Sequence, residues 1–244
     1  MLEIKNLSKS FKDFSLEKIN LKINKGDFIA FIGENGSGKT TIIKLIFNLL
    51  KKDNGEIIIN NENLFLENKL KEICLFPNQG EIPYNLTVKD YLWYVSVLAN
   101  VNRESYNNRI IKILEIIKIV ELQKRKIKTL STGQIKKVML AGVLIVEPSF
   151  IFMDEPTANL DIDSKEELLE IINFLSNREV GIFITSHITD ELDKYVNRLI
   201  VLKNGQIVYD EKYIKGSGKI LEIYNRFYIK KENVTKQLGD LYEK

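Results

Sequence analysis

Short apolar runs separated by longer polar and helix-like stretches recur along this chain of 244 residues. The clearest runs are FIAFIG at 28–33, FIFMD at 150–154 and GIFITS at 181–186. Each run is followed by polar residues and then by a helical pattern, which is typical of parallel strands buried on both faces. The pattern therefore predicts an α/β fold built on a parallel core sheet.

Towards both ends of the chain the pattern changes to strands and hairpins. Candidate strands are LEIKNL at 2–7, LEKINLKIN at 16–24, EIIIN at 56–60 and the segment RLIVLKNGQIVYD at 198–210. Asn204 and Gly205, within the last segment, are a strong signal for a two-residue hairpin turn. We expect these segments to form an antiparallel sheet near the termini.

The middle of the chain has a helical pattern. Across 105–120, Ile110, Leu114 and Ile117 fall on one face of a helix and charged residues fall off it. We expect one domain, with a helical subdomain at 82–146 inserted into a core formed by 1–81 and 147–210. That core would carry the antiparallel β subdomain, and 211–244 would form a C-terminal extension.

Composition narrows the class of protein. The net charge is only +3 and the basic residues are scattered, so nucleic acid is not an expected partner. The one cysteine, Cys74, fits a reducing compartment and predicts a buried small hydrophobe. The beginning of the chain lacks the plan of a secretory signal, and the longest apolar stretch, VMLAGVLIV at 138–146, is far shorter than the roughly 20 residues that cross a bilayer. We therefore expect a soluble protein, for which any membrane crossing would need a separate chain.

A glycine-rich loop is the strongest chemical signal. Residues 33–40, GENGSGKT, fit the phosphate-loop pattern G-x-x-x-x-G-K-[ST], between a predicted strand and the predicted helix TTIIKLIFNLL. Glycines let backbone N–H groups turn inward around a phosphate, the helix start adds its positive dipole end, and Lys39 adds a full charge. Thr40 can hold Mg²⁺ through its hydroxyl. The predicted nucleotide-binding residues here are Gly33, Glu34, Asn35, Gly36, Ser37, Gly38, Lys39, Thr40 and Thr41; the alternative is an ordinary glycine-rich turn.

A second segment imitates a guanine-reading motif. Residues 24–27, NKGD, resemble the Asn-Lys-x-Asp of GTPases, but they precede the phosphate loop, whereas the guanine reader follows it by a long interval. Lys25 and Gly26 instead predict a hairpin turn between two strands.

Two adjacent carboxylates end the run at 150–154. Ligands of parallel sheets collect at the carboxyl ends of strands, so Asp154 and Glu155 are placed to act on a bound phosphate. Asp154 would orient Mg²⁺ and Glu155 would position or deprotonate the attacking water. The only histidine, His187, ends the run ITSH in the same way, and LSTGQ at 130–134 forms a small polar loop ahead of a helical run.

In order and spacing these motifs resemble the nucleotide-binding subunits of ABC transporters, over nearly the whole chain to about Asp210. The resemblance implies a P-loop ABC ATPase fold that binds ATP and Mg²⁺, with Lys39, Glu155 and His187 as catalytic residues. Phe11 lies where an aromatic ring stacks on adenine in this family, with Phe14 as the competing candidate and an ordinary core phenylalanine as the other alternative. The loop at 130–134 and the segment Asn159, Leu160, Asp161 match parts that reach a partner subunit. The residues implied to contact the partner's ATP are Ser131, Thr132, Gly133, Gln134 and Asp161.

Two positions depart from the family pattern. Thr132 replaces a glycine in the loop that the family writes LSGGQ, and we expect this position not to need a positive φ, since a β-branched residue there would cost about 1–3 kcal/mol. The family also places a glutamine near the metal; counting back from NLTV at Asn85 gives Asn78 rather than Gln79. Both Asn78 and Gln79 stay candidates for the metal site, with Thr40 and Asp154.

The expected function is an ATPase subunit that drives a separate membrane-spanning permease from the cytoplasmic face of the cell membrane. Two copies, or one copy and a related subunit, would sandwich the nucleotide. The resemblance is strongest to the ATPases of drug, lantibiotic-immunity or ABC-2-type exporters, so we expect export. The alternatives are a soluble ABC ATPase without a membrane partner and a nucleotide-gated dimerisation clamp. Residues 219–234, KILEIYNRFYIKKENV, predict an amphipathic helix that either packs on its own domain or lies against a membrane or partner.

Overall fold

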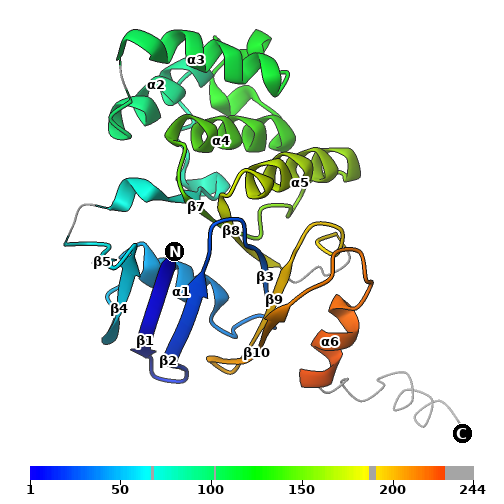
Figure 1. Cartoon of the computed structure of the whole chain (residues 1–244). Coiled ribbons are helices and arrows are strands. Elements are labelled where there is room, and N and C mark those ends of the chain that lie inside the picture. The colour runs from blue at the N-terminus through cyan, green and yellow to red at the C-terminus, as the bar shows by residue number, and fades with distance from the viewer. Residues whose placement is uncertain (67–68, 102, 187–190, 229–244) are drawn as a thin grey trace, which may run out of the picture.

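The computed structural model describes residues 1–66, 69–101, 103–186 and 191–228, without the side chains of 79 and 103–106. Two sheets lie at the bottom of the view and a group of helices lies above them (Figure 1). The described chain contains both helices and strands, and its larger sheet is mainly parallel, so the predicted α/β class is confirmed.

The first sheet is antiparallel and has four strands in the order β2-β1-β4-β5. Its strands are β1 (Leu2–Ser10), β2 (Ser15–Ile23), β4 (Asn54–Ile59) and the short β5 (Glu62–Asn63). Gly55 is required in β4 because its φ is +104° and a Cβ there would lie 2.6 Å from the Cα of Leu7. The helix α1 (Lys39–Ile46) packs between this sheet and the second one (Figure 1).

The second sheet has six strands in the order β10-β9-β3-β8-β7-β6. Its members are β3 (Phe28–Ile32), β6 (Ile73–Phe76), β7 (Phe150–Asp154), β8 (Gly181–Ser186), β9 (Arg198–Lys203) and β10 (Gln206–Lys212). All neighbouring pairs are parallel except β9 with β10. The three apolar runs of the sequence are parallel strands of this sheet, as predicted, and the structure shows that they are direct neighbours in the order β3-β8-β7.

Side chains alternate between two apolar clusters on the faces of the core sheet. In β3, Ile29 and Phe31 face the cluster that contains α1, whereas Ala30 faces the cluster that contains the helical lobe. Phe31, Phe183 and Phe152 form a continuous aromatic row, with ring centroids 4.8 and 5.3 Å apart. The carboxyl ends of β3, β7 and β8 are thereby held in fixed register.

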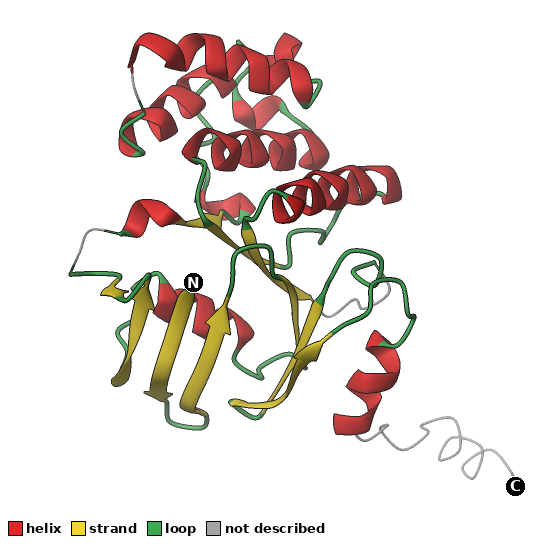
Figure 2. Cartoon of the chain, viewed as in Figure 1, coloured by secondary structure: helices red, strands yellow, loops and turns green. Residues whose placement is uncertain are grey.

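Helices cover the other face of the core sheet. The lobe contains α2 (Val88–Leu98), α3 (Arg103–Ile116) and α4 (Thr132–Val146), and α5 (Ile162–Asn177) lies beside α4 (Figure 2). Short 3₁₀ turns connect them or flank the edge strand: η1 (Leu70–Glu72), η2 (Gln79–Glu81), η3 (Val120–Leu122) and η4 (Ile127–Thr129). The last described helix, α6 (Ile220–Phe227), lies against the β9–β10 side of the core sheet (Figure 2).

For the helix predicted at 105–120, the buried face was predicted correctly and the C-terminal end was not. Ile110, Leu114 and Ile117 are buried, as the pattern predicted. The helix stops at Ile116, because Lys118 adopts a left-handed φ of 58° that an α-helix cannot continue through.

The prediction that the hairpin at 198–210 belongs to the antiparallel sheet was wrong. Asn204 and Gly205 do form its turn, with φ values of 48° and 75°. However, β9 pairs with β3, so the hairpin extends the core sheet instead of joining the antiparallel sheet of the N-terminus. The reason is that both faces of β9 are apolar and buried, which only a strand covered on two sides can satisfy.

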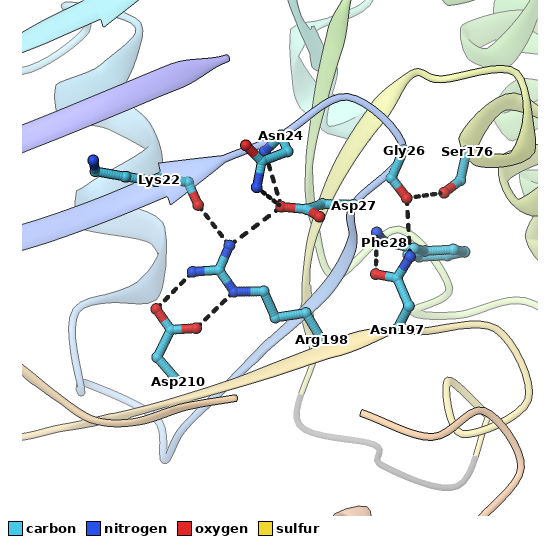
Figure 3. A network of polar contacts seen from close by, with 9 residues as sticks. All are labelled: Lys22, Asn24, Gly26, Asp27, Phe28, Ser176, Asn197, Arg198 and Asp210. Atoms are coloured by element: carbon cyan, nitrogen blue, oxygen red, sulfur yellow. Dashed lines mark hydrogen bonds and ion pairs between the residues drawn. The ribbon is translucent and has the colours of Figure 1, made fainter. Parts of the chain in front are cut away.

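Lys25 and Gly26 form a turn, but the prediction of a hairpin was wrong, because β2 and β3 belong to different sheets. A polar network holds the connection at 24–27, where the chain passes from β2 in one sheet to β3 in the other (Figure 3). Arg198 donates to both carboxylate oxygens of Asp210 at 2.6 and 2.7 Å and to Asp27 at 3.2 Å. Residues 24–27 thus lie at the amino end of β3, at the opposite end of that strand from the phosphate loop.

Across the described residues, no helix has the length and apolarity of a membrane span. Cys74 is half-buried in β6, the edge strand of the core sheet. Burial raises the pKa of its thiol to about 12, so it behaves as an unreactive small apolar group.

Candidate nucleotide-binding site

The phosphate loop leaves the carboxyl end of β3 and enters α1 at Gly38. Gly36 and Gly38 have φ values of +82° and +110°, conformations that side chains other than glycine rarely adopt. Gly33 is needed for space, because a Cβ there would lie 2.5 Å from the carbonyl oxygen of Leu202. The glycines therefore let the backbone curl closely over the helix start, where N–H groups have no intrahelical partner.

Lys39 is folded back under this loop. Its Nζ donates to the carbonyl oxygens of Gly33 at 2.7 Å and Glu34 at 3.1 Å, and only 6% of the residue is exposed. Burial lowers the pKa of Lys39, and the nearby carboxylates of Glu155 and Asp154 oppose that shift. A buried ammonium held mainly by neutral carbonyls would gain from an anionic partner, which is what a bound phosphate supplies.

Thr40, at the start of α1, meets Asp154, at the carboxyl end of β7. The Thr40 hydroxyl donates to Oδ2 of Asp154 at 2.7 Å, and the Thr185 hydroxyl donates to Oδ1 at 2.5 Å. A hydroxyl and a carboxylate are the hard oxygen donors that Mg²⁺ takes, with phosphate oxygens and waters as its other ligands. Among the described residues no three acidic, histidine or cysteine side chains cluster as a metal site.

Glu155 lies one residue past the end of β7, with a φ of 47°. Its N–H is held by the side-chain and main-chain oxygens of Thr185, at 3.1 and 3.2 Å. A pocket of about 400 Å³ opens here, lined by Thr40, Asn78, Lys136, Asp154, Glu155, Ala158 and Asn159. The turn after β7 thus brings both carboxylates of the predicted pair to one cavity.

Asn78 is one of the residues that line this pocket, whereas the side chain of Gln79 lies outside the described part of the chain. The N–H of Asn78 donates to Oε2 of Glu81 at 3.0 Å, which fixes the start of η2. Of the two amides proposed from the sequence, Asn78 is therefore the one for which the structure supports proximity to Thr40 and Asp154.

A second, adjacent pocket of about 580 Å³ lies beside the loop. It is lined by Ser10, Phe11, Lys12, Asp13, Phe14, Ser15, Glu34, Asn35, Gly36, Ser37, Asn204 and Tyr228. Phe11 is 44% exposed, so the alternative of an ordinary core phenylalanine is wrong. Phe14 also lines this pocket but packs inward under Gly38. Phe11 is the better placed of the two rings to stack on a base.

The loop at 130–134 lines neither of these two pockets. Ser131 caps α4, and it exchanges hydrogen bonds with Gln134: Gln134 N donates to Ser131 Oγ at 3.3 Å and Ser131 N to Gln134 Oε1 at 3.0 Å. Asp161 caps α5 in a similar way, and hydrogen bonds from Ser164 lower its pKa. Ser131 and Asp161 are both exposed. Thr132 and Gly133 open α4, and Thr132 does not have a positive φ, as predicted.

His187, predicted as a catalytic residue, lies outside the described residues. The sequence did not single out Thr185, Lys136 or Tyr228. Thr185 holds Asp154 and Glu155, Lys136 lines the acid pocket, and Tyr228 lines the pocket of Phe11. Their sequence contexts are an apolar strand, a helix and the C-terminal extension, and none of these carries a recognisable pattern.

Comparison with known proteins identifies a family and relatives that this chain resembles. Residues 16–158 match the family model described as ABC transporter. The lantibiotic transport ATP-binding protein SrtF of Streptococcus pyogenes is 31% identical over 226 residues, which cover 92% of this chain and 96% of that protein. The molybdate/tungstate import ATP-binding protein WtpC of Methanocaldococcus jannaschii is 30% identical over 209 residues, covering 85% and 69%.

A solved dimeric ATP-binding cassette in a post-hydrolysis state, bound to ADP and Pi, superposes with a TM-score of 0.75 at 26% identity, covering 88% of this chain and 99% of that one. Such cassettes bind nucleotide, form dimers and work with transporter subunits. The family match, the two relatives and the fold agree with the motifs found in the sequence. This chain belongs to the ABC transporter family as an ATP-binding subunit, a transporter ATPase.

Proposed function

We propose that this chain powers export through a separate membrane-spanning permease, as one half of a dimer that holds ATP between its two subunits. The observation that carries the proposal is a division within the chain. The loop of Lys39 and the acid pair line two pockets that fit one half of a nucleotide site, whereas the loop at 130–134, in which Ser131 is exposed, lines neither of these two pockets. A second subunit would bring that loop to the nucleotide.

Each residue of the first half has a role that follows from its geometry. Lys39 and the N–H groups between Gly36 and Thr40 would bind the phosphates, and Phe11 would stack on the adenine. Thr40, Asp154 and Asn78 would hold Mg²⁺, directly or through water; when bound, the ion neutralises charge that builds up on the phosphate oxygens. Glu155 would orient the attacking water and accept its proton. We assign His187 to the same site from the sequence alone.

The second half of the proposed nucleotide site consists of residues at the N-terminal ends of two helices. Ser131 and Gly133 lie at the positive end of α4, and Asp161 lies at the start of α5. Contacts from this loop to the γ-phosphate would exist only while the phosphate bridges both subunits. Hydrolysis would remove them, and the subunits would separate.

A groove between the helical lobe and the edge of the core sheet is the proposed contact with the permease. Its volume is about 710 Å³, and it lies between the edge strand β6 and α2, with Leu70 and Leu98 exposed beside it. Strand β6 ends at Phe76, two residues before Asn78. A helical segment of the permease that presses on this groove would therefore move the amide of Asn78 relative to the acid pocket. This contact would place the chain at the cytoplasmic face of the membrane.

Export is supported by the likeness to the lantibiotic transport protein, which extends over nearly the full length of both chains. The likeness to the molybdate/tungstate import protein covers less of that protein. Reconstitution of the chain with a co-purified permease in vesicles would test the direction. Substrate that accumulates on the side opposite the ATPase supports export, and uptake towards the ATPase contradicts it.

Mixing two defective variants tests the shared site. Lys39→Ala removes the ammonium group that would bind the phosphates. Ser131→Asp keeps a good helix cap but places a negative charge next to the phosphate. Each variant alone has two defective sites. In an equal mixture, random pairing creates one intact site in about half of the dimers, so about a quarter of the wild-type turnover should return. A mixture as inactive as its components would contradict the shared site.

A further inference from the structure

The C-terminal extension contributes a side chain to the nucleotide site. Tyr228 directly follows α6 and is 8% exposed. Its hydroxyl donates to the carbonyl oxygen of Leu202 at 2.5 Å and accepts the backbone N–H of Glu34 at 3.2 Å. It therefore joins the end of β9 to the phosphate loop, whose Glu34 lies 194 residues before Tyr228 in the sequence.

The same peptide unit is held at its other end by Lys39. The peptide between Gly33 and Glu34 presents its carbonyl oxygen to Lys39 Nζ at 2.7 Å and its N–H to Tyr228. Rotation of this peptide would break both contacts at once. The Tyr228 hydroxyl thus helps to set the orientation of this peptide, whose carbonyl oxygen is one of the two that hold the Lys39 ammonium.

Tyr228 is itself fixed in place. The ammonium of Lys203 lies 5.8 Å from the centre of its ring and donates to the carbonyl oxygen of Phe227 at 2.7 Å. Tyr224 stacks on it with ring centroids 4.4 Å apart. Burial raises the pKa of Tyr228, so the hydroxyl remains a hydrogen-bond donor at neutral pH.

We infer that Tyr228 is a positioning residue for ATP binding: by holding the N–H of Glu34 it keeps the phosphate loop in its binding shape and couples the docking of α6 to nucleotide occupancy. The inference rests on the nucleotide site proposed above. Coupling of this kind is reciprocal, so ATP must stabilise the docked α6 by the same factor by which α6 favours ATP.

The test removes one hydroxyl. Tyr228→Phe should raise the Kd for a fluorescent ATP analogue and the KM for ATP about three- to tenfold, with kcat within about twofold. Tyr224→Phe is the matched control, because it removes a hydroxyl from the neighbouring ring and keeps the stack; its Kd should be unchanged. Competition by tripolyphosphate should weaken in Tyr228→Phe, while competition by adenosine should not.

A second readout reports the coupling directly. ATP should slow tryptic cleavage after Arg226 in the wild type and in Tyr224→Phe, and should protect this bond less in Tyr228→Phe. An unchanged Kd with unchanged protection would overturn the inference, as would weaker adenosine binding with normal tripolyphosphate binding. Lys39→Ala distinguishes failure of the proposed nucleotide site from failure of the role of Tyr228. If Lys39→Ala keeps full ATP affinity, the proposed site is wrong. If Lys39→Ala loses ATP binding and Tyr228→Phe is unaffected, only the role of Tyr228 is refuted.

Discussion

Thr40 donates a hydrogen bond of 2.7 Å to Asp154, a residue 114 positions later in the chain. The contact joins the start of α1 to the end of β7 at one edge of the core sheet. It places the hydroxyl and the carboxylate where a single Mg²⁺ could bind both, so it is the local basis for the metal part of the proposed site.

Removing either partner should weaken the response to Mg²⁺. Thr40→Ala and Asp154→Asn should each shift the Mg²⁺ dependence of ATP hydrolysis to higher concentration, by about tenfold or more for Asp154→Asn because a charged ligand is lost. Thr40→Ser keeps the hydroxyl and is the control. A Mg²⁺ titration at fixed ATP measures the shift, and identical curves for all variants would exclude these residues as metal ligands.

Glu155→Gln should separate binding from hydrolysis. The amide cannot accept the proton of the attacking water, so turnover should fall by about 100- to 10,000-fold while ATP still binds. The variant should then accumulate as an ATP-bound dimer, visible by size-exclusion chromatography with ATP and Mg²⁺. Undiminished phosphate release would show that Glu155 is not the base.

Lys39→Ala should impair nucleotide binding itself. Loss of a charge-assisted contact to phosphate is expected to weaken ATP affinity about 10- to 100-fold. Lys44→Ala, an exposed lysine on the same helix, is the matched control and should bind ATP normally. Equilibrium titration with a fluorescent ATP analogue compares the two, and equal affinities would refute the phosphate-loop assignment.

Thr132→Gly tests the departure from the family loop. Thr132 is the first residue of α4 and has no positive φ, so glycine relieves no strain there. We expect turnover within about threefold of the wild type and a slightly less stable helix, since glycine lowers helix propensity. A rise in steady-state ATPase rate by orders of magnitude would contradict this explanation.

Cys74 should resist alkylation while the protein is folded. Its pKa is raised by burial from 9.0 to about 12, so at about pH 8.5 the native thiolate is at least 100-fold scarcer than in the unfolded chain. Iodoacetamide labelling with and without urea measures the ratio. The raised pKa also contributes stability that is present below about pH 9 and is lost as pH rises towards 12, because the unfolded chain releases its proton first. Fast native labelling would contradict both statements.

Local pattern was sufficient for the central strands and for the phosphate loop. The runs at 28–32, 150–154 and 181–186 are apolar at every position or nearly so, and only a strand covered on both faces accepts such a run. The phosphate loop could be predicted as well, because Gly36 and Gly38 adopt conformations that other residues rarely adopt, and Gly33 lies where a Cβ would not fit. Spacing along the chain carries this information without knowledge of any distant contact.

Sheet membership and the end of the central helix were beyond local pattern. The turn at Asn204 was predicted correctly, but whether β9 pairs with β3 or with the N-terminal sheet depends on which partner buries its second face. In the same way, nothing local assigned Tyr228 or Thr185 to the site: each acts through a hydrogen bond to a residue at least 30 positions away. The sequence by itself determined the phosphate loop, the acid pair and the α/β class, because these depend on residue type at short spacing. Only the tertiary structure decided which strands are neighbours and which distant side chains hold the loop and the acids, because those choices depend on burial shared between remote segments.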